Sequence, residues 1–336
     1  MLFRRLVSGA LLVTGVLVYS SQALAVAESA APSLTIPPGA RANGMGEAYV
    51  AVADDATAAW WNVGGMAFMK NRNLSFMYSP LVPDLASDVN YQFLGYTSPA
   101  GKSGVWGLHL IYLSYGKSIA TDTEGNTLRE FTSWEGGLAA SYGLTLGENV
   151  GVGISLKYIR VALAPADVTQ DNVEGSGSSF AVDVGSMWKL PKQHVNVGLS
   201  VVNMGPDIAF IDREQSDPLP FTARFGIGYT PLHDDVSNLL VTADIEQSLV
   251  WLIAGNNPDG SSPQRRSEIW HAGAEYRYVN LLAGRVGYVY DKDGDFNAAT
   301  YGLGFIYKDK LSLDYANVPQ AKDLERVHRW SITFTF

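Results

Sequence analysis

The sequence contains no cysteine, which excludes disulfide bonds and thiolate metal sites. Charged residues make up only 17% of its 336 residues, below the roughly 25% of a typical soluble domain. Beyond the N-terminal region no apolar run is long enough for a membrane-spanning helix, because glycine and charged residues interrupt each one. The formal net charge of −9 argues against nucleic acid as a partner, since that binding needs a basic surface.

The N-terminal region has the three parts of a secretory signal peptide. A basic start over Met1 to Arg5 precedes an apolar run from Leu6 to Tyr19, and Ala23-Leu24-Ala25 offers small residues at a cleavage position. The apolar run is shorter than the roughly 20 residues that a spanning helix needs. We therefore predict a signal peptide over residues 1–25 and an exported mature chain.

Beyond residue 70 the chain consists of segments in which apolar and polar residues alternate, separated by Gly, Pro, Asn and Asp clusters. In the final segment, Trp330, Ile332 and Phe334 share one face of a strand, and the polar residues between them share the other. An even number of such strands is typical of bacterial outer-membrane barrels. We count fourteen runs: 72–80, 89–98, 104–115, 129–144, 149–161, 178–190, 194–204, 219–230, 238–247, 267–278, 281–291, 297–308, 310–317 and 327–336.

The lengths of the connections support a barrel, because outer-membrane barrels have short periplasmic turns and longer external loops. Aromatic residues at strand ends, such as Tyr158, Tyr229 and Tyr307, would form its interfacial girdle. The sequence thus predicts an all-β transmembrane antiparallel β-barrel of about 14 strands over residues 72–336. A soluble β-sandwich or propeller is the alternative that alternation alone leaves open. With both termini in the periplasm, the long connections are 116–128, 162–177, 205–218, 248–266 and 318–326, and the short ones include 145–148, 191–193, 279–280 and 309.

A segment rich in glycine and alanine, GARANGMGEAYVAVADDATAAWWNVGGMA, spans Gly39 to Ala67 ahead of the first strand. It lacks the G-x-x-x-x-G-K-[ST] pattern of a phosphate-binding loop. We predict a short helix from about Glu47 or Asp54 to Trp61, ended by the glycines that follow. Asp54 and Asp55 are expected to cap this helix, and a metal or catalytic pair is the alternative interpretation.

From Gly39 to Asn62 the pattern G-A-R-A-x-G-M-G-x-A-x-x-A-V-A-D-D-A-x-A-x-x-W-N resembles the N-terminal signature of PorV/PorQ-like outer-membrane proteins. These are similar to the FadL long-chain fatty acid transporters, whose fourteen-stranded barrels hold an N-terminal hatch in the lumen. The resemblance implies a hatch over residues 26–71. Its motif residues, with a structural or gating role, would be Gly39, Arg41, Gly44, Gly46, Asp54, Asp55, Trp61, Asn62, Gly64 and Gly65.

The chain departs from the family pattern after Asn62, where the proline and the alanine are lost. The family usually continues W-N-P-A-G-L, whereas this chain has Trp61-Asn62-Val63-Gly64-Gly65-Met66, so the bracing or movement of the hatch would differ. The C-terminal strand fits the family, because its terminal Phe336 resembles the aromatic residue that the barrel-assembly machinery recognises.

The resemblance implies two functions in the outer membrane of a Gram-negative-type bacterium. A PorV-like component of type IX secretion would contact outer-membrane lipid and bind secretion subunits or the C-terminal domains of secreted proteins. A FadL-like protein would instead allow passive uptake of long-chain fatty acids or other hydrophobic molecules. The signature favours the first, and neither implies an enzyme or a cofactor.

Other candidate sites are weaker. No catalytic site is predicted, because none of the five histidines lies in a known catalytic motif. Asp291, Asp293 and Asp295 alternate as in a calcium loop, but the glycine is misplaced, so a polar hairpin tip is favoured over a weak metal site. Candidate contacts for a partner protein or hydrophobic ligand are Trp251, Leu252 and Ile253, although Trp251 would fit the aromatic girdle equally well.

Charged residues of both signs fall on the polar faces of the predicted strands, where an unpaired charge would be costly. We expect them to form a pairing network that either seats a plug or lines a wet path. They are Glu135, Lys157, Asp183, Arg224, Asp244, Glu246, Glu275, Arg277, Arg285, Asp314 and Arg329.

Overall fold

The computed structural model describes residues 29–101, 104–122, 124–169, 173–210, 216–253, 265–320 and 325–336. The predicted signal peptide lies outside these residues. In the part of the chain that is described, no helix has the length and apolar character needed to cross a membrane.

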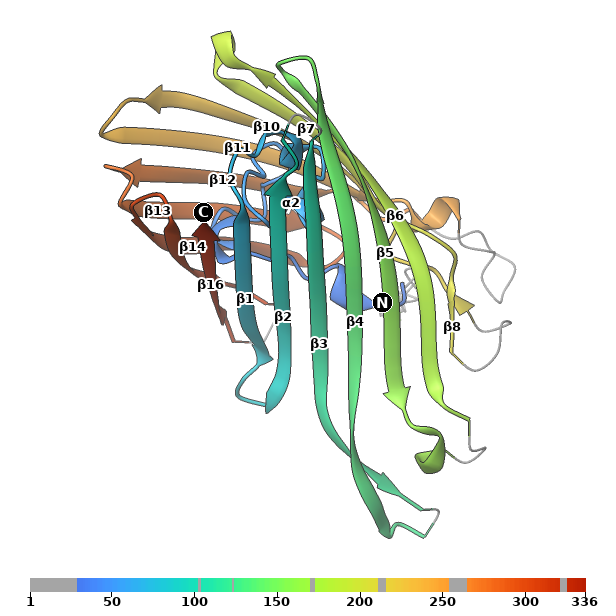
Figure 1. The fold of residues 1–336 in the computed structure, drawn as a ribbon. Helices are drawn as coiled ribbons and strands as arrows, with labels where there is room; N and C mark the ends of the chain where they lie inside the picture. Colours follow the sequence, from blue (N-terminus) through green and yellow to red (C-terminus); the bar gives the residue numbers. More distant parts are fainter. Residues whose placement is uncertain are drawn as a thin grey trace, which may run out of the picture.

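Within the described residues, fourteen antiparallel strands form a closed barrel, in which β1 pairs with β16 (Figure 1). This confirms the predicted fold class, and each predicted run overlaps one strand. The strands are β1 (Asn73–Val82), β2 (Ala86–Pro99), β3 (Val105–Thr121), β4 (Thr127–Leu146), β5 (Val150–Ala164), β6 (Gly175–Leu190), β7 (Val195–Met204), β10 (Thr222–His233), β11 (Ser237–Ser248), β12 (Ile269–Tyr278), β13 (Leu282–Asp291), β14 (Phe296–Tyr307), β15 (Leu311–Val318) and β16 (Val327–Thr335).

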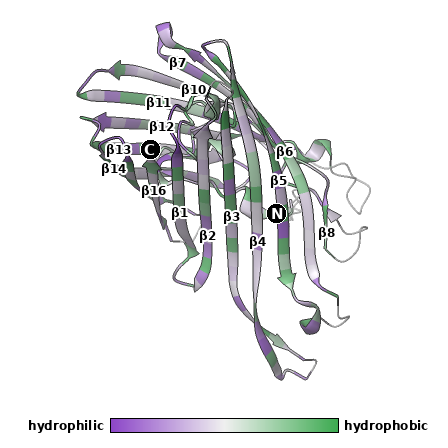
Figure 2. Cartoon of the chain, viewed as in Figure 1, coloured by the Kyte–Doolittle hydropathy of each residue, from purple (hydrophilic) through white to green (hydrophobic). Residues whose placement is uncertain are grey.

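The strand faces have the polarity of a membrane barrel. On β5, Leu156 points outward and is 57% exposed, whereas the next residue, Lys157, points inward and is 3% exposed. The outward residues Trp330 and Leu303 are likewise 61% and 65% exposed. This alternation produces the colour bands along the strands in Figure 2. A soluble sandwich would bury these apolar side chains, so the alternative left open by the pattern is wrong.

Two connections differ from the prediction. The segment 116–128 is largely strand, because β3 and β4 continue as a paired hairpin that projects beyond the other strands (Figure 1). Its outer part carries a Lys117–Glu130 ion pair and has few apolar residues, so it lacks the alternation that marks the wall. The predicted connection 205–218 contains a small two-stranded sheet of β8 (Ile208–Ala209) and β9 (Ser216–Asp217).

The N-terminal segment lies inside the barrel (Figure 1) and contains η1 (Pro32–Leu34), α1 (Ala40–Gly44), α2 (Ala58–Trp61) and η2 (Gly65–Phe68). The predicted helix ends at Trp61 as expected, but its predicted start is wrong. Gly46 and Glu47 have φ angles of 64° and 66°, which interrupt helical geometry, and α2 begins only at Ala58. The helix α1 was not predicted, because glycine precedes it and is also its last residue.

Candidate functional site

Arg41 on α1 joins the hatch to the barrel wall. Its Nε and Nη2 donate to the two carboxylate oxygens of Glu275 on β12 at 2.9 and 3.0 Å, a bidentate pair. Its Nη1 donates to the Tyr49 hydroxyl at 2.8 Å and to the carboxylate of Asp54. Burial opposes the charge on Arg41, but the neighbouring carboxylates of Asp54 and Glu275 raise its pKa well above the ordinary value. The guanidinium is therefore held charged inside the lumen.

Glu275 is the centre of a larger ion-pair network on the wall. It also accepts hydrogen bonds from Arg277 at 2.8 Å and from Arg285 at 2.7 Å. Arg285 is the cross-strand partner of Glu275 on β13, and it pairs with Asp314 on β15 at 2.7 Å. Glu275, Arg285 and Asp314 are all at most 4% exposed. The predicted pairing of luminal charges is thus observed here, and in the separate Lys157–Asp183 and Arg224–Glu246 pairs at 2.8 and 2.6 Å.

Other polar wall residues bond directly to hatch groups. The Val50 amide donates to Asp244 at 2.7 Å, and the Ser33 amide donates to Glu135 at 2.9 Å. Arg329 donates to the side-chain oxygen of Asn43 on α1. These contacts come from several strands around the barrel, so the luminal charges seat the hatch.

Two motif glycines let the hatch backbone lie directly against the wall. A Cβ atom on Gly64 would lie 2.6 Å from the Cα atom of Ser186 on β6. On Gly46 it would lie 2.5 Å from the amide nitrogen of Tyr288, and the φ angle there is 64°. In the W-N-P-A-G-L pattern that this stretch resembles, alanine stands at the position of Gly64, and a Cβ atom would not fit at this distance from β6.

The remaining apolar and amide motif residues brace the hatch. Asn62 donates to the carbonyl of Val50 at 2.8 Å and of Ser186 at 3.0 Å, and its side-chain oxygen accepts from the Gly64 amide at 3.0 Å. The Trp61 indole donates to the Pro38 carbonyl at 3.0 Å. Asn62 therefore ties together two parts of the hatch and the wall.

The other motif glycines lie at the ends of short helices. Gly39 precedes α1, and its amide contacts the Met77 sulfur at 3.1 Å. Gly44 is the last residue of α1, where a Cβ atom would lie 2.9 Å from the Cα atom of Gly302. Gly65 begins η2.

Asp54 and Asp55 do not cap α2 as predicted. The N-cap residue is Thr57, which makes no side-chain capping bond. Asp54 instead pairs with Arg41. Asp55 accepts from the Thr57 amide at 2.8 Å and from the Tyr49 hydroxyl at 2.9 Å, while burial and then the charge of Asp54 raise its pKa. Among the described residues, no group of three or more His, Asp and Glu side chains is placed to hold a metal ion.

The carboxylates of the possible calcium loop stabilise the hairpin between β13 and β14. Asp291 accepts from the amides of Asp293 and Gly294 at 3.1 and 2.9 Å, and it pairs with Arg266 at 3.2 Å. Asp293 accepts from the Ser267 hydroxyl at 3.0 Å. Asp295, with a φ angle of 47°, completes the turn between β13 and β14. These contacts are those of a polar hairpin tip.

The last two predicted sites lie at opposite ends of the barrel. Trp251 lies half-buried in the short helix η6 (Val250–Leu252), with Leu252 and Ile253 exposed beside it at the end of the barrel that carries the long connections. Phe336 pairs its amide and carbonyl with those of Arg72, at 3.0 Å each, and its side chain is exposed.

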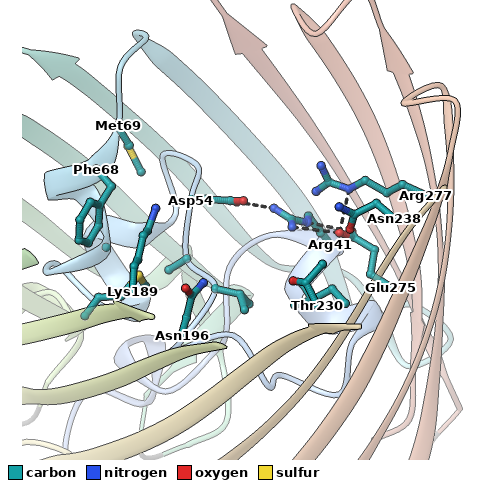
Figure 3. A pocket seen from close by; sticks show the side chains of 15 residues that line it. Arg41, Asp54, Phe68, Met69, Lys189, Asn196, Thr230, Asn238, Glu275 and Arg277 are labelled. Atoms are coloured by element: carbon teal, nitrogen blue, oxygen red, sulfur yellow. Dashed lines mark hydrogen bonds and ion pairs between the residues drawn. The ribbon is translucent and has the colours of Figure 1, made fainter. Parts of the chain in front are cut away.

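Two cavities lie against the hatch. An outer cavity of about 650 Å³ lies toward the long connections and is lined by Trp60, Arg224 and His271, among others. Arg224 lies 4.5 Å from the Trp60 ring centre, a contact that the sequence did not reveal. An inner cavity of about 230 Å³ lies toward the short turns, with Asp54 and Arg41 near its middle (Figure 3). The two cavities share no lining residue.

Comparisons with known proteins give one family and one fold. Residues 19–253 match the family described as Type IX secretion system protein PorV. The Pseudomonas putida toluene transporter TodX has a TM-score of 0.58 at 12% identity, over 89% of this chain and 97% of that chain. A Pseudomonas aeruginosa FadL homologue has a TM-score of 0.50 at 11% identity, over 88% and 97%. At such identities the likeness concerns the fold alone. No curated protein sequence matches the chain.

Proposed function

We propose, because the chain belongs to the PorV family of type IX secretion system proteins, that this outer-membrane β-barrel binds secreted proteins or secretion partners at the outer membrane. The family match carries the proposal. It extends from residue 19 to residue 253, which includes the whole hatch and every strand from β1 to β11.

The contacts that seat the hatch support binding over passage. The hatch is held by the buried Arg41–Glu275 pair and by wall contacts on several strands. The outer cavity has charged side chains such as Arg224, Glu246 and Arg266 among its apolar lining, and it shares no lining residue with the inner cavity, so the two cavities do not form one continuous path. A protein partner would therefore bind the external rim without crossing the barrel.

The apolar residues Leu252 and Ile253 are the proposed partner contact on that rim. They are 56% and 45% exposed and follow the external end of β11. Val250 beside them is buried, which fixes the short helix to the barrel while its neighbours face outward. Burying such side chains against a partner would contribute about 1.5–3 kcal/mol each.

Passive uptake of a hydrophobic molecule is the second candidate function, favoured by the shared fold with TodX and a FadL homologue. This function would require the hatch to open or move. The two functions predict different molecules bound to the purified protein.

The test is affinity purification of the tagged full-length protein from detergent-solubilised outer membranes, followed by mass spectrometry. A Leu252→Asp/Ile253→Asp variant tests the rim. Leu85→Asp is the matched control, because Leu85 is 78% exposed in the connection between β1 and β2. We expect secretion subunits or cargo C-terminal domains with the wild type and the control, and fewer with the double variant. A barrel that carries only fatty acid or other lipid would contradict the proposal and leave uptake.

A further inference from the structure

The hatch backbone runs along the barrel wall at positions where the wall residue is glycine. On β13, a Cβ atom added to Gly287 would lie 2.0 Å from the amide nitrogen of Gly46. On β12, a Cβ atom added to Gly273 would lie 2.2 Å from the carbonyl oxygen of Met45. Cβ atoms in proteins do not approach other atoms so closely, so these two wall positions have room only for glycine.

Such contacts continue around the barrel. A Cβ atom added to Gly153 on β5 would lie 2.5 Å from the carbonyl oxygen of Val63, and one added to Gly198 on β7 would lie 2.4 Å from that of Val50. The strands β2, β3, β4, β6, β10 and β14 also carry a glycine whose added Cβ atom would lie within 3.0 Å of a hatch atom. The hatch is therefore held closely by strands on all sides of the lumen.

The remaining strands hold the hatch through other contacts. On β1 the sulfur of Met77 accepts from a hatch amide at 3.1 Å, and on β16 the hydroxyl of Ser331 accepts from another at 3.0 Å. Asp244 on β11 accepts from the Val50 amide at 2.7 Å. The helix α1 packs against β15. Each strand of the barrel thus contacts the hatch, and the contacts form a closed ring.

The two cavities lie on the two faces of this ring. Glu47 and Trp61 line the outer cavity, whereas Arg41 and Asp54 line the inner one (Figure 3). Within the described residues, no side chain that lines the outer cavity also lines a cavity on the side of the short turns. The two spaces are therefore separate.

We infer that the hatch is a permanent seal of this barrel, impermeable to ions, and that its close contact with the wall glycines makes it so. A part of the hatch that left the wall would strand buried amides and carbonyls without partners, which is costly. It would also leave a gap beside the wall glycines, which have no side chain to fill it. The inference does not depend on the proposed function, because it concerns the lumen and not the external rim.

Ion conductance of the purified full-length barrel in planar lipid bilayers tests the seal. The wild type should show no conductance steps in molar potassium chloride. Gly287→Leu should produce them, because the new side chain has no room beside Gly46 and must displace the hatch. Gly284→Leu is the matched control on the same strand and should stay silent, because no atom lies within 4 Å of its added Cβ atom.

Folding of each variant is verified by the heat-dependent gel migration of an intact barrel, and Gly273→Leu on β12 is the second variant if Gly287→Leu does not fold. Conductance steps with the wild type would overturn the inference. A folded Gly287→Leu barrel that stays silent would overturn it too, because close contact with the glycines would then not be what seals the lumen. Equal conductance of Gly284→Leu would have the same meaning.

Discussion

Replacement of Glu275 by glutamine should loosen the hatch while leaving the barrel closed. The substitution keeps the shape of the side chain but removes the carboxylate that Arg41, Arg277 and Arg285 share at 2.7–3.0 Å. Glu275 is 1% exposed and its partner Arg285 is 3% exposed, so water cannot replace the carboxylate beside Arg285. Removing one partner of a buried ion pair typically lowers the free energy of unfolding by about 3–5 kcal/mol.

Hydrogen exchange measured by mass spectrometry reports this loosening at the amides of α1. The Asn43 amide donates to the Gly39 carbonyl at 3.1 Å, so it exchanges only when the hatch opens locally. A loss of about 3 kcal/mol raises the open population by more than about a hundredfold. The backbone amides of strands β2 to β5 should stay protected from exchange, because the hydrogen bonds between these strands do not involve Glu275.

Glu130→Gln is the matched control. Glu130 pairs with Lys117 at 3.2 Å, and both side chains are more than half exposed. Exposed pairs contribute about 0–1 kcal/mol, so exchange in the hatch should not change. If Glu275→Gln and Glu130→Gln gave the same slow exchange at α1, the ion-pair network would not be what holds the hatch.

Three further predictions concern the hatch. Gly64→Ala should lower the free energy of unfolding of the hatch by about 1–3 kcal/mol, because the added Cβ atom would lie 2.6 Å from the Cα atom of Ser186. Gly284→Ala is the control and should leave this free energy unchanged, because no atom lies within 4 Å of its added Cβ atom. Limited proteolysis of the hatch measures both effects. Asn62→Ala should lower the free energy of unfolding by about 1–3 kcal/mol, because the carbonyls of Ser186 and Val50 lose their side-chain donor. Thermal unfolding measures this loss. The pKa of Asp55 is raised, so the folded state binds the proton of this carboxyl more tightly than the unfolded state does. The stability of the hatch should therefore fall as the pH rises from the ordinary aspartate pKa to the raised one. Hydrogen exchange of the hatch measured against pH should show this dependence in the wild type and lose it in Asp55→Asn.

The sequence predicted the barrel wall better than the hatch inside the barrel. Alternation at Leu156 and Lys157 fixes which side chain faces lipid and which faces the lumen, because a strand has a period of two. The hairpin beyond Tyr115 was missed, because polar Lys117 and apolar Ile119 are both exposed on the same face, so apolar and polar residues do not alternate there as they do on the wall. The start of α2 was placed too early, because positive φ angles at Gly46 and Glu47 reflect packing against β12 and β13.

The contacts of the candidate site depended on docking of the hatch. The sequence placed Glu275 and Arg285 on polar strand faces, and their cross-strand pairing follows from the hairpin. That Arg41 would join them could not be predicted, because the two partners are 234 residues apart and meet only through the position of α1. Asp54 was expected as a cap for the same reason, since local sequence does not reveal Arg41 beside it.

Binding measured with purified components tests the central claim most directly. The full-length barrel in detergent would be immobilised and exposed to an isolated C-terminal domain of a type IX secreted protein, with interferometry as the readout. The account predicts saturable binding that the Leu252→Asp/Ile253→Asp variant weakens and the Leu85→Asp variant does not. Absence of binding by a barrel that retains co-purified fatty acid would contradict it.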